Sequence, residues 1–167
     1  MKNITILGAT GSIGLSTLNV ISRHLNEYRV FAVSAHSDWK GLLNICKNHR
    51  PSFAVLMDEA AAEKLKQAIP SETEVLCGKD SLNAIASHKN TDFVMAAIVG
   101  SAGISSTFSA ARAGKRIMLA NKESLVLGGT LLINLAKKSG AEIIPVDSEH
   151  SAIFQCLKGG SDGLNKI

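Results

Sequence analysis

The chain has 167 residues, of which 46% are hydrophobic and 19% charged, a balance that excludes a disordered protein and predicts one domain with a real core. Only 4% of the residues are aromatic, so we expect an aliphatic core, which suits a parallel sheet covered by helices. The net charge is +4 without a lysine or arginine run, which argues against nucleic-acid and membrane partners. No apolar run approaches the length of a membrane span, and no signal peptide is expected before the first strand.

The three cysteines, Cys46, Cys77 and Cys156, stand far apart in the sequence. No two of them form a C-x-x-C pair, and an odd number argues against a disulfide framework. We therefore expect buried, reduced thiols in a cytoplasmic protein.

A strand, a glycine turn and a helix are predicted at the amino end. Ile4, Ile6 and Leu7 form a short aliphatic run typical of a buried strand. Residues 8–14 then read Gly-Ala-Thr-Gly-Ser-Ile-Gly, and a helix is expected over residues 12–25, facing the sheet through Ile13, Leu18, Ile21 and Leu25. Such a turn leaves backbone N–H groups unpaired at the helix start, where they bind anions such as a pyrophosphate.

Each glycine of this turn has an expected role. Gly8 makes the tight turn, Gly11 lets a pyrophosphate approach the backbone, and Gly14 lets the helix lie close to the strand. Thr10 and Ser12 add hydroxyl donors, and Ser12 is a good N-cap. The alternative is a strand–turn–helix corner that binds nothing.

Short apolar strands alternate with helices along the rest of the chain. Further strands are expected at residues 28–35, 53–57, 74–77, 93–99, 116–120 and 142–146. Further helices are expected at residues 39–48, 58–68, 81–87, 106–113 and 125–139. A last helix is expected after residues 147 and 148, ending at residue 157. This alternation predicts an α/β fold with a doubly wound, mostly parallel sheet, without a linker typical of a domain boundary.

The end of the second predicted strand bears on the choice of cofactor. A carboxylate about 20 residues past the glycines would hold the ribose 2′-hydroxyl of NAD. This strand ends at Ala35 without a carboxylate, and His36, Ser37 and Asp38 follow. The missing acid favours NADP, although Asp38 is near enough to keep NAD open; its alternative role is the N-cap of helix 39–48.

Polar side chains follow the strand predicted at residues 116–120. Because ligands lie outside the carboxyl ends of the strands in open α/β sheets, Asn121, Lys122 and Glu123 are candidates for a site. Lys122 is suited to a phosphate or a developing oxyanion, and Glu123 to an ion pair or a cofactor contact. The alternative is a solvated helix start, with Asn121 as N-cap and Glu123 in the first turn.

Two carboxylates follow the last predicted strand, at Asp147 and Glu149. On an extended backbone, residues two apart point the same way. At a separation of about 5 Å and an effective dielectric of 20, two such charges repel by about 3 kcal/mol, so the pair needs a cation or a proton. Oxygen ligands of this kind suit Mg²⁺ or Mn²⁺. The alternative is that Asp147 or Ser148 caps a helix running to Leu157.

Four stretches together resemble the amino-terminal part of the 1-deoxy-D-xylulose 5-phosphate reductoisomerase family. The first motif is common to many dehydrogenases, whereas the last two, in this order and spacing, are specific. The resemblance runs along the whole chain and is weakest between about residues 36 and 92. The stretches are Gly-Ala-Thr-Gly-Ser-Ile-Gly (8–14), Met-Ala-Ala-Ile-Val-Gly-Ser-Ala-Gly (95–103), Leu-Ala-Asn-Lys-Glu-Ser-Leu-Val (119–126) and Pro-Val-Asp-Ser-Glu-His-Ser-Ala-Ile-Phe-Gln (145–155).

The resemblance implies a Rossmann-like NADPH-binding domain over residues 1–146 and the start of a catalytic, metal-binding domain over residues 147–167. It implies an enzyme of non-mevalonate isoprenoid biosynthesis that converts 1-deoxy-D-xylulose 5-phosphate to 2-C-methyl-D-erythritol 4-phosphate. The implied cofactors are NADPH and Mn²⁺ or Mg²⁺, and the implied assembly is a homodimer of the full-length enzyme.

The resemblance also implies roles for individual residues. The cofactor contacts are Thr10, Gly11, Ser12, Ile13, Asn121 and Glu123, together with His36 and Ser37, which stand where many members carry a Gly-Lys-Asn-like turn. The phosphorylated sugar substrate would contact Lys122, Ser148 and Glu149, with Lys122 and Glu149 catalytic. The metal ligands would be Asp147 and Glu149.

Members of that family are more than twice as long as this chain. We therefore expect an amino-terminal part that lacks the third metal carboxylate, the substrate phosphate pocket, the mobile flap and the carboxyl-terminal helical domain, and that turns over poorly or not at all. Two alternatives stay open: another Rossmann reductase, of the aspartate-semialdehyde or dihydrodipicolinate type, and a non-catalytic dinucleotide-binding module. A dinucleotide-binding module without catalysis would not need the two carboxylates of Asp147 and Glu149.

Overall fold

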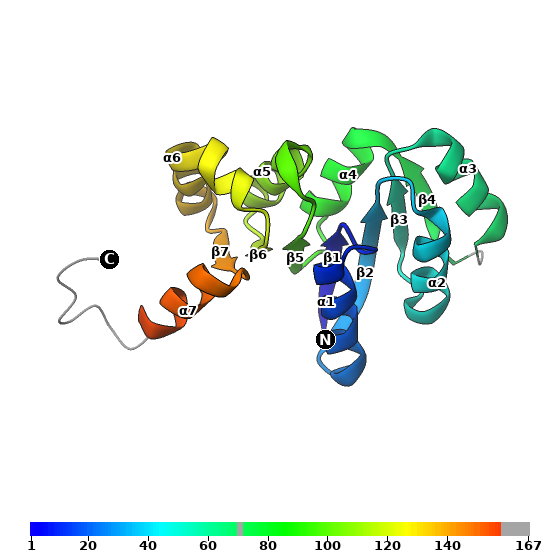
Figure 1. Cartoon of the computed structure of the whole chain (residues 1–167), viewed down its shortest axis with the longest axis horizontal. Helices are drawn as coiled ribbons and strands as arrows, with labels where there is room; N and C mark the ends of the chain where they lie inside the picture. The colour runs from blue at the N-terminus through cyan, green and yellow to red at the C-terminus, as the bar shows by residue number, and fades with distance from the viewer. Residues whose placement is uncertain (70–71, 158–167) are drawn as a thin grey trace.

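The computed structural model describes residues 1–69 and 72–157, apart from the side chain of Glu149. Within these residues seven strands form one sheet in the order β4-β3-β2-β1-β5-β6-β7, and every neighbouring pair is parallel (Figure 1). This confirms the predicted doubly wound α/β fold. The strands are β1 (Lys2–Leu7), β2 (Tyr28–Ala35), β3 (Phe53–Leu56), β4 (Glu74–Cys77), β5 (Phe93–Ala96), β6 (Arg116–Leu119) and β7 (Glu142–Pro145).

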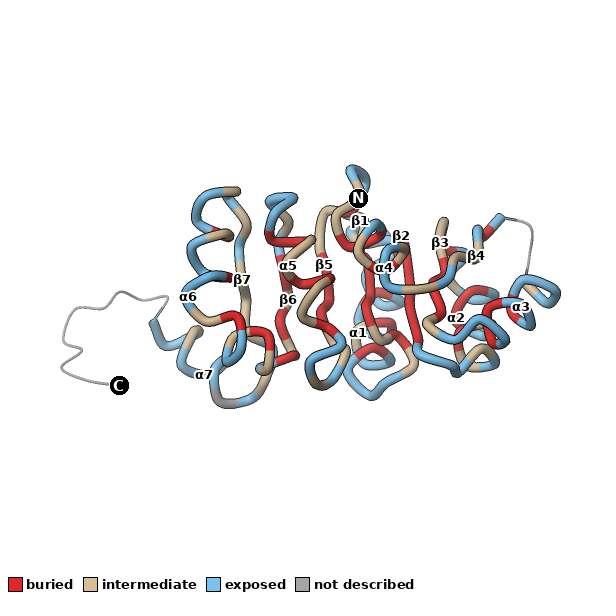
Figure 2. Tube along the Cα trace, turned by 90° about the horizontal axis from the view of Figure 1, so that it is seen from above, coloured by how far each residue is buried: buried red, intermediate tan, exposed pale blue. Residues whose placement is uncertain are grey.

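Helices cover both faces of the sheet. Helices α1, α2 and α3 pack on one face, and α4, α5 and α6 pack on the other. Because both faces are covered, many residues of the strands are buried (Figure 2). None of the helices in the described ranges combines the length and apolarity that crossing a bilayer requires. The helices are α1 (Ser12–Arg23), α2 (Trp39–His49), α3 (Glu59–Ala68), α4 (Gly78–Ser87), η1 (Gly100–Gly103, a 3₁₀ turn), α5 (Ile104–Arg112), α6 (Lys122–Ser139) and α7 (Ser148–Leu157).

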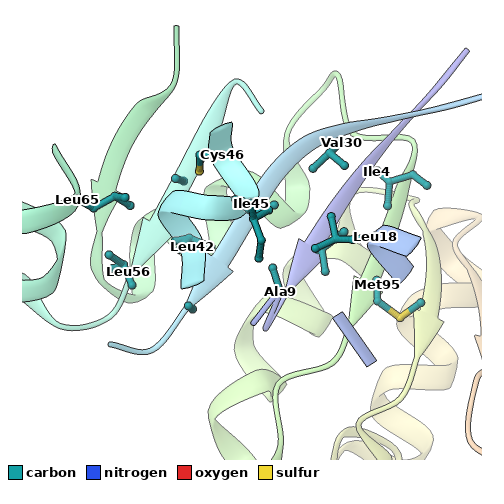
Figure 3. Close-up of a cluster of buried hydrophobic side chains, with 14 of the residues drawn as sticks. Ile4, Ala9, Leu18, Val30, Leu42, Ile45, Cys46, Leu56, Leu65 and Met95 are labelled. Atoms are coloured by element: carbon teal, nitrogen blue, oxygen red, sulfur yellow. The ribbon is translucent and has the colours of Figure 1, made fainter. Parts of the chain in front are cut away.

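The core on the α1 face is aliphatic, as the composition predicts. Leu18 from α1, Leu42 and Ile45 from α2 and Leu65 from α3 lie against the sheet (Figure 3). Each fully buried aliphatic side chain of this size stabilises the fold by about 1.5–3 kcal/mol. The sheet is therefore a rigid platform for the loops at its edges.

Two aspartates begin helices on this face. Asp38 accepts a hydrogen bond from the backbone N–H of Gly41 at 2.9 Å, and Asp58 accepts one from Ala61 at 2.7 Å. Each carboxylate satisfies one of the amides that have no partner within the helix. The structure thus gives Asp38 its alternative role as N-cap of α2.

Some expectations for α1 and for the cysteines are wrong. The N-cap of α1 is Gly11 and not Ser12, and the helix ends at Arg23, where the N–H of His24 closes onto the carbonyl of Ile21. Leu25 follows that end and is therefore 63% exposed, and Ile13 is 38% exposed. Among the thiols, Cys46 is buried, whereas Cys77 and Cys156 are exposed.

Several element ends also differ from the prediction. The most informative case is β5, which ends at Ala96, three residues before the expected end of the apolar run. Residues 97–99 remain apolar but have left the sheet, and η1 follows them. Apolar character alone does not distinguish a strand from a loop that lines a cavity.

Candidate functional site

The winding of the sheet reverses between β1 and β5, which lie side by side (Figure 1). A crevice is expected at such a point in a parallel sheet. The loop after β5 contacts the end of β1, because the N–H of Ala97 donates to the carbonyl of Leu7 at 3.0 Å. A cavity of about 340 Å³ lies at this point. It is lined by Gly8, Thr10, Gly11, Ser34, Ala35, His36, Met57, Leu82, Ala97, Ile98, Val99 and Ala102.

Gly8 and Gly14 shape the turn as predicted. Gly8 has a φ of +84°, and a Cβ there would lie 2.9 Å from the carbonyl oxygen of Ala97. A Cβ at Gly14 would lie 2.4 Å from the carbonyl oxygen of Gly8. The tight turn and the close approach of α1 to β1 therefore both require glycine.

The start of α1 is suited to an anion. Its N-cap, Gly11, has no side chain, and no described side chain caps the helix. The first amides of α1, at Ser12 and Ile13, belong to exposed residues. Unpaired N–H groups and the positive end of the helix dipole favour a phosphate at this position. A Cβ at Gly11 would meet only the carbonyl oxygen of Gly8, at 3.5 Å, so its role toward a pyrophosphate stays a prediction.

The end of β2 presents His36 to the cavity. The backbone carbonyl of His36 accepts hydrogen bonds from Met57 and Asp58, which fixes the loop against the start of α3. His36 and Ser37 are both exposed. Asp38 is committed to α2 by its bond to Gly41, so the carboxylate nearest to the end of β2 already has a structural role.

The apolar walls of the cavity were missed by the sequence reasoning. Met57 follows β3 directly, and Ile98, Val99 and Ala102 follow β5. The rule that ligands lie outside the carboxyl ends of strands would have found these four residues. Leu82 lies inside α4, where no sequence signal separates it from an ordinary core residue.

The predicted polar group after β6 forms the start of α6. Asn121 is the N-cap, with its Oδ1 accepting from the N–H of Ser124 at 2.8 Å, and it is only 2% exposed. Lys122 is exposed and Glu123 half-buried in the first turn. The helix-start alternative therefore describes the local structure, and contacts of Lys122 and Glu123 with a ligand remain predictions.

The predicted metal carboxylate Asp147 follows β7. Its Oδ1 accepts from the backbone N–H of His150 at 2.9 Å and contacts the Nδ1 of that residue at 2.7 Å. The bond from the backbone N–H, reinforced by the imidazole, holds the pKa of this carboxyl below its usual value. Asp147 is therefore ionised at neutral pH, as a metal ligand must be.

The expected extended geometry of Asp147 and Glu149 is wrong. Helix α7 begins at Ser148, so Glu149 stands in its first turn rather than on an extended backbone. Asp147 precedes that turn, as the capping alternative predicted. The side chain of Glu149 lies outside what the structure describes, and Ser148 is exposed. Among the described side chains, no three His, Cys, Asp or Glu residues converge as a metal site.

The nucleotide turn and Asp147 lie at the same edge of the sheet, because β1 and β7 are parallel members of one sheet. A second observation agrees with this placement. Ile13 in the first turn of α1 and Val146, next to Asp147, line one apolar groove of about 390 Å³. Asp147 therefore lies at the edge of the sheet that also carries the glycine turn.

The parallel sheet, the glycine turn and the crevice at its switch point define a dinucleotide-binding domain of the Rossmann class. The family model for 1-deoxy-D-xylulose 5-phosphate reductoisomerase matches residues 4–129. The chain therefore belongs to the 1-deoxy-D-xylulose 5-phosphate reductoisomerase family.

Similar proteins agree with this membership. The 1-deoxy-D-xylulose 5-phosphate reductoisomerase of Vesicomyosocius okutanii is 56% identical over all of this chain, which spans 44% of that relative's length. A crystal structure of DOX-P reductoisomerase with NADPH, fosmidomycin and magnesium has a TM-score of 0.90 at 46% identity, over 99% of this chain and 41% of the other. The Zymomonas mobilis reductoisomerase with NADPH has a TM-score of 0.89 at 45% identity, over 93% of this chain and 41% of the other.

Proposed function

We propose that this chain is the NADPH-binding part of an enzyme that converts 1-deoxy-D-xylulose 5-phosphate to 2-C-methyl-D-erythritol 4-phosphate with a divalent metal. One observation carries the proposal: the cavity between the loops after β1 and β5 lies at the same edge of the sheet as the carboxylate of Asp147. A coenzyme and a metal-bound substrate need such a common edge in order to meet.

The cavity and its rim fit a phosphorylated dinucleotide. Residues 10–13 provide hydroxyl and backbone donors for the phosphates and ribose at the uncapped start of α1. His36 and Ser37, at the end of β2, would contact the adenosine ribose, and Asn121 and Glu123 would be further contacts with the coenzyme. Met57 and Ala102 offer apolar surfaces to a base.

The carboxylates after β7 fit a hard cation. Asp147 with Glu149 would hold Mg²⁺ or Mn²⁺, and Lys122 and Ser148 would contact the phosphorylated substrate. When bound, the metal acts as a Lewis acid on substrate oxygens and NADPH provides the hydride. Lys122 would stabilise negative charge as it develops on oxygen, and Glu149 would act as a catalytic carboxylate.

The fold supports the division into two domains that we propose. Residues 1–146 form the NADPH-binding domain, and α7 begins the catalytic domain proposed for residues 147–167, of which residues 158–167 lie outside the described residues. The segment after β7 packs mainly against that edge strand, which supports a separate unit. We infer that the full-length enzyme is a cytoplasmic homodimer with a small-molecule substrate and no nucleic-acid or membrane partner, in line with the thinly spread charge of +4.

Coenzyme binding is tested by titrating the chain with NADPH and with NADH while nicotinamide fluorescence is followed. We expect saturable binding of NADPH and weaker binding of NADH, because the carboxylate nearest to the end of β2, that of Asp38, caps α2. Turnover of 1-deoxy-D-xylulose 5-phosphate by the chain alone should be poor. Absence of saturable NADPH binding contradicts the proposal.

The metal site is tested with the variant Asp147→Asn. Asparagine keeps the acceptor that begins α7 and removes the charge, so the helix should persist while the affinity for Mn²⁺ falls. Electron paramagnetic resonance of Mn²⁺ measures that affinity, and the NADPH titration serves as the control that should stay nearly unchanged. Equal Mn²⁺ affinity in both proteins favours a dinucleotide-binding module without a metal.

A further inference from the structure

Helix α6 contains a kink. It runs over Lys122–Ser139, but the backbone of Gly129 has a φ of +44° and a ψ of −132°, which is not helical. The helix therefore consists of two parts that meet at this residue: a front part, residues 122–128, and a rear part, residues 130–139. Sharp kinks in helices have identifiable local causes, and glycine is one of them.

The rear part is fixed to the sheet. Leu132 is fully buried in the core on the α4 face, and Ala136 is 5% exposed. The hydroxyl of Ser139 donates to the carbonyl of Ala111 in α5. At the end of the helix, the N–H of Gly140 donates to the carbonyl of Ala136. The rear part therefore cannot change its direction without opening the core.

The front part packs closely on α5. Gly128 is buried, and a Cβ there would lie 2.9 Å from Cε2 of Phe108 in α5. Ser124 is fully buried, and its hydroxyl lies 3.4 Å from the hydroxyl of Thr107, also in α5. Two adjacent glycines thus have different roles: Gly128 allows the close approach to α5, and Gly129 allows the change of direction.

The direction of the front part decides where the first turn of α6 lies. Lys122 and Glu123 stand in that turn, directly after the end of β6. A rise of about 1.5 Å per residue puts Lys122 about 10 Å from Gly129 along the helix. A change of about 20° at the kink would therefore move the first turn by about 3–4 Å. A hydrogen bond to a ligand does not survive a displacement of that size.

Few residues other than glycine can adopt the conformation of Gly129. Its ψ of −132° lies far outside the left-handed region, and a Cβ would contact the residue's own backbone there. No described atom of another residue lies within 4 Å of a Cβ built at this position. A side chain is therefore disfavoured by the backbone conformation alone. Because alanine is the best helix former, Gly129→Ala should straighten α6.

We propose that Gly129 is a positioning residue: its non-helical backbone turns the front part of α6 away from the line of the rear part and so places Lys122 and Glu123 for their ligands. The functional half of this inference rests on the proposed function, in which Lys122 contacts the substrate and Glu123 contacts the coenzyme. The structural half, the direction of the front part, stands on the backbone of Gly129 and on the packing of the two parts.

The test compares Gly129→Ala with the matched control Gly140→Ala. Gly140 ends the same helix with a φ of +75°, and there too no described atom lies within 4 Å of an added Cβ. At both positions alanine replaces a glycine of positive φ in open space, but only Gly129 lies at the kink. Amide residual dipolar couplings measure the direction of residues 122–128 relative to residues 130–139, and nicotinamide fluorescence measures the Kd for NADPH.

In Gly129→Ala we expect the two parts of α6 to become nearly collinear. The Kd for NADPH should rise about tenfold, which is the scale of losing a hydrogen bond to a charged group. In Gly140→Ala the angle and the Kd should stay those of the unchanged chain, although the urea midpoint falls. Gly129→Asn is the second variant in case Gly129→Ala does not fold. Because asparagine reaches positive φ more easily than alanine, it should change the angle and the Kd in the same direction by less.

The two readouts distinguish the alternatives. An unchanged angle in the Gly129 variants overturns the proposal, because other contacts then set the direction of the front part. A changed angle with an unchanged Kd also overturns it, since the direction then has no effect on the coenzyme. Equal weakening of NADPH binding in Gly140→Ala does so too, because it indicates general destabilisation. If the unchanged chain binds no NADPH, the proposed function fails, whereas the angle comparison still supports or overturns the structural half.

Discussion

Gly14 determines how closely α1 approaches β1. A Cβ at this position would lie 2.4 Å from the carbonyl oxygen of Gly8 and 2.6 Å from Cα of Ala9, and backbone atoms cannot yield as a flexible side chain does. We expect Gly14→Ala to lower the free energy of unfolding by about 1–3 kcal/mol, the usual range for overpacking, and to weaken NADPH binding. Urea denaturation and the fluorescence titration measure the two effects.

Gly11→Ala is the control for that substitution. The added methyl group would meet only the carbonyl oxygen of Gly8, at 3.5 Å, and Gly11 has a φ of −79°, which alanine adopts without strain. We expect nearly unchanged stability and weaker NADPH binding, because the methyl group occupies the approach of the pyrophosphate. A Gly14→Ala protein as stable as the unchanged chain contradicts the account of the turn.

The three cysteines should differ in reactivity. Burial raises the pKa of the Cys46 thiol to about 12, and the side chain is fully enclosed between α2 and the sheet. Cys77 and Cys156 are exposed. Alkylation of the native protein followed by mass spectrometry should therefore mark Cys77 and Cys156 well before Cys46, and denaturation should abolish the difference. Equal labelling of Cys46 in the native state refutes the packing around α2.

At the scale of the elements, the sequence predicts the existence and type of each strand and helix, but not all of their ends. The apolar run after Phe93 looks like a strand up to Val99, yet β5 stops at Ala96. The reason is a long-range interaction: Asn121, from the loop after β6, holds the carbonyl of Ile98 outside the sheet. Patterns within one segment carry no information about a partner in another segment.

The start of α2 illustrates a choice that the sequence left open. Asp38 was compatible with a ribose contact and with a helix cap, and the structure shows the cap. We expect Asp38→Ala to lower the free energy of unfolding by about 0.5–2 kcal/mol and Asp38→Ser to restore most of it, because serine also caps helices. Neither change should weaken NADH binding.

Denaturation and NADH titration of both Asp38 variants test this role together. If Asp38→Ser keeps its stability but binds NADH much more weakly, the carboxylate serves the ribose as well as the helix. The account then loses its reason for preferring NADPH at the end of β2.

At the scale of the whole molecule, the common edge of the site was predictable and its walls were not. A parallel sheet brings the carboxyl ends of all its strands to one side, so Thr10 and Asp147 share an edge although they are far apart in sequence. The depth of the cavity depends on which side chains turn inward, as Met57 and Leu82 do. That detail follows from packing in three dimensions and has no local signature.

The central claim is that the cavity between the loops after β1 and β5 holds NADPH. A titration of the isotopically labelled chain with NADPH, followed by amide chemical shifts, tests it most directly. We predict that the largest shifts fall on residues 8–14 and 97–103, with the end of β2 next. Shifts confined to the apolar groove beside Val20 and Met118, or no saturable shifts at all, would contradict it.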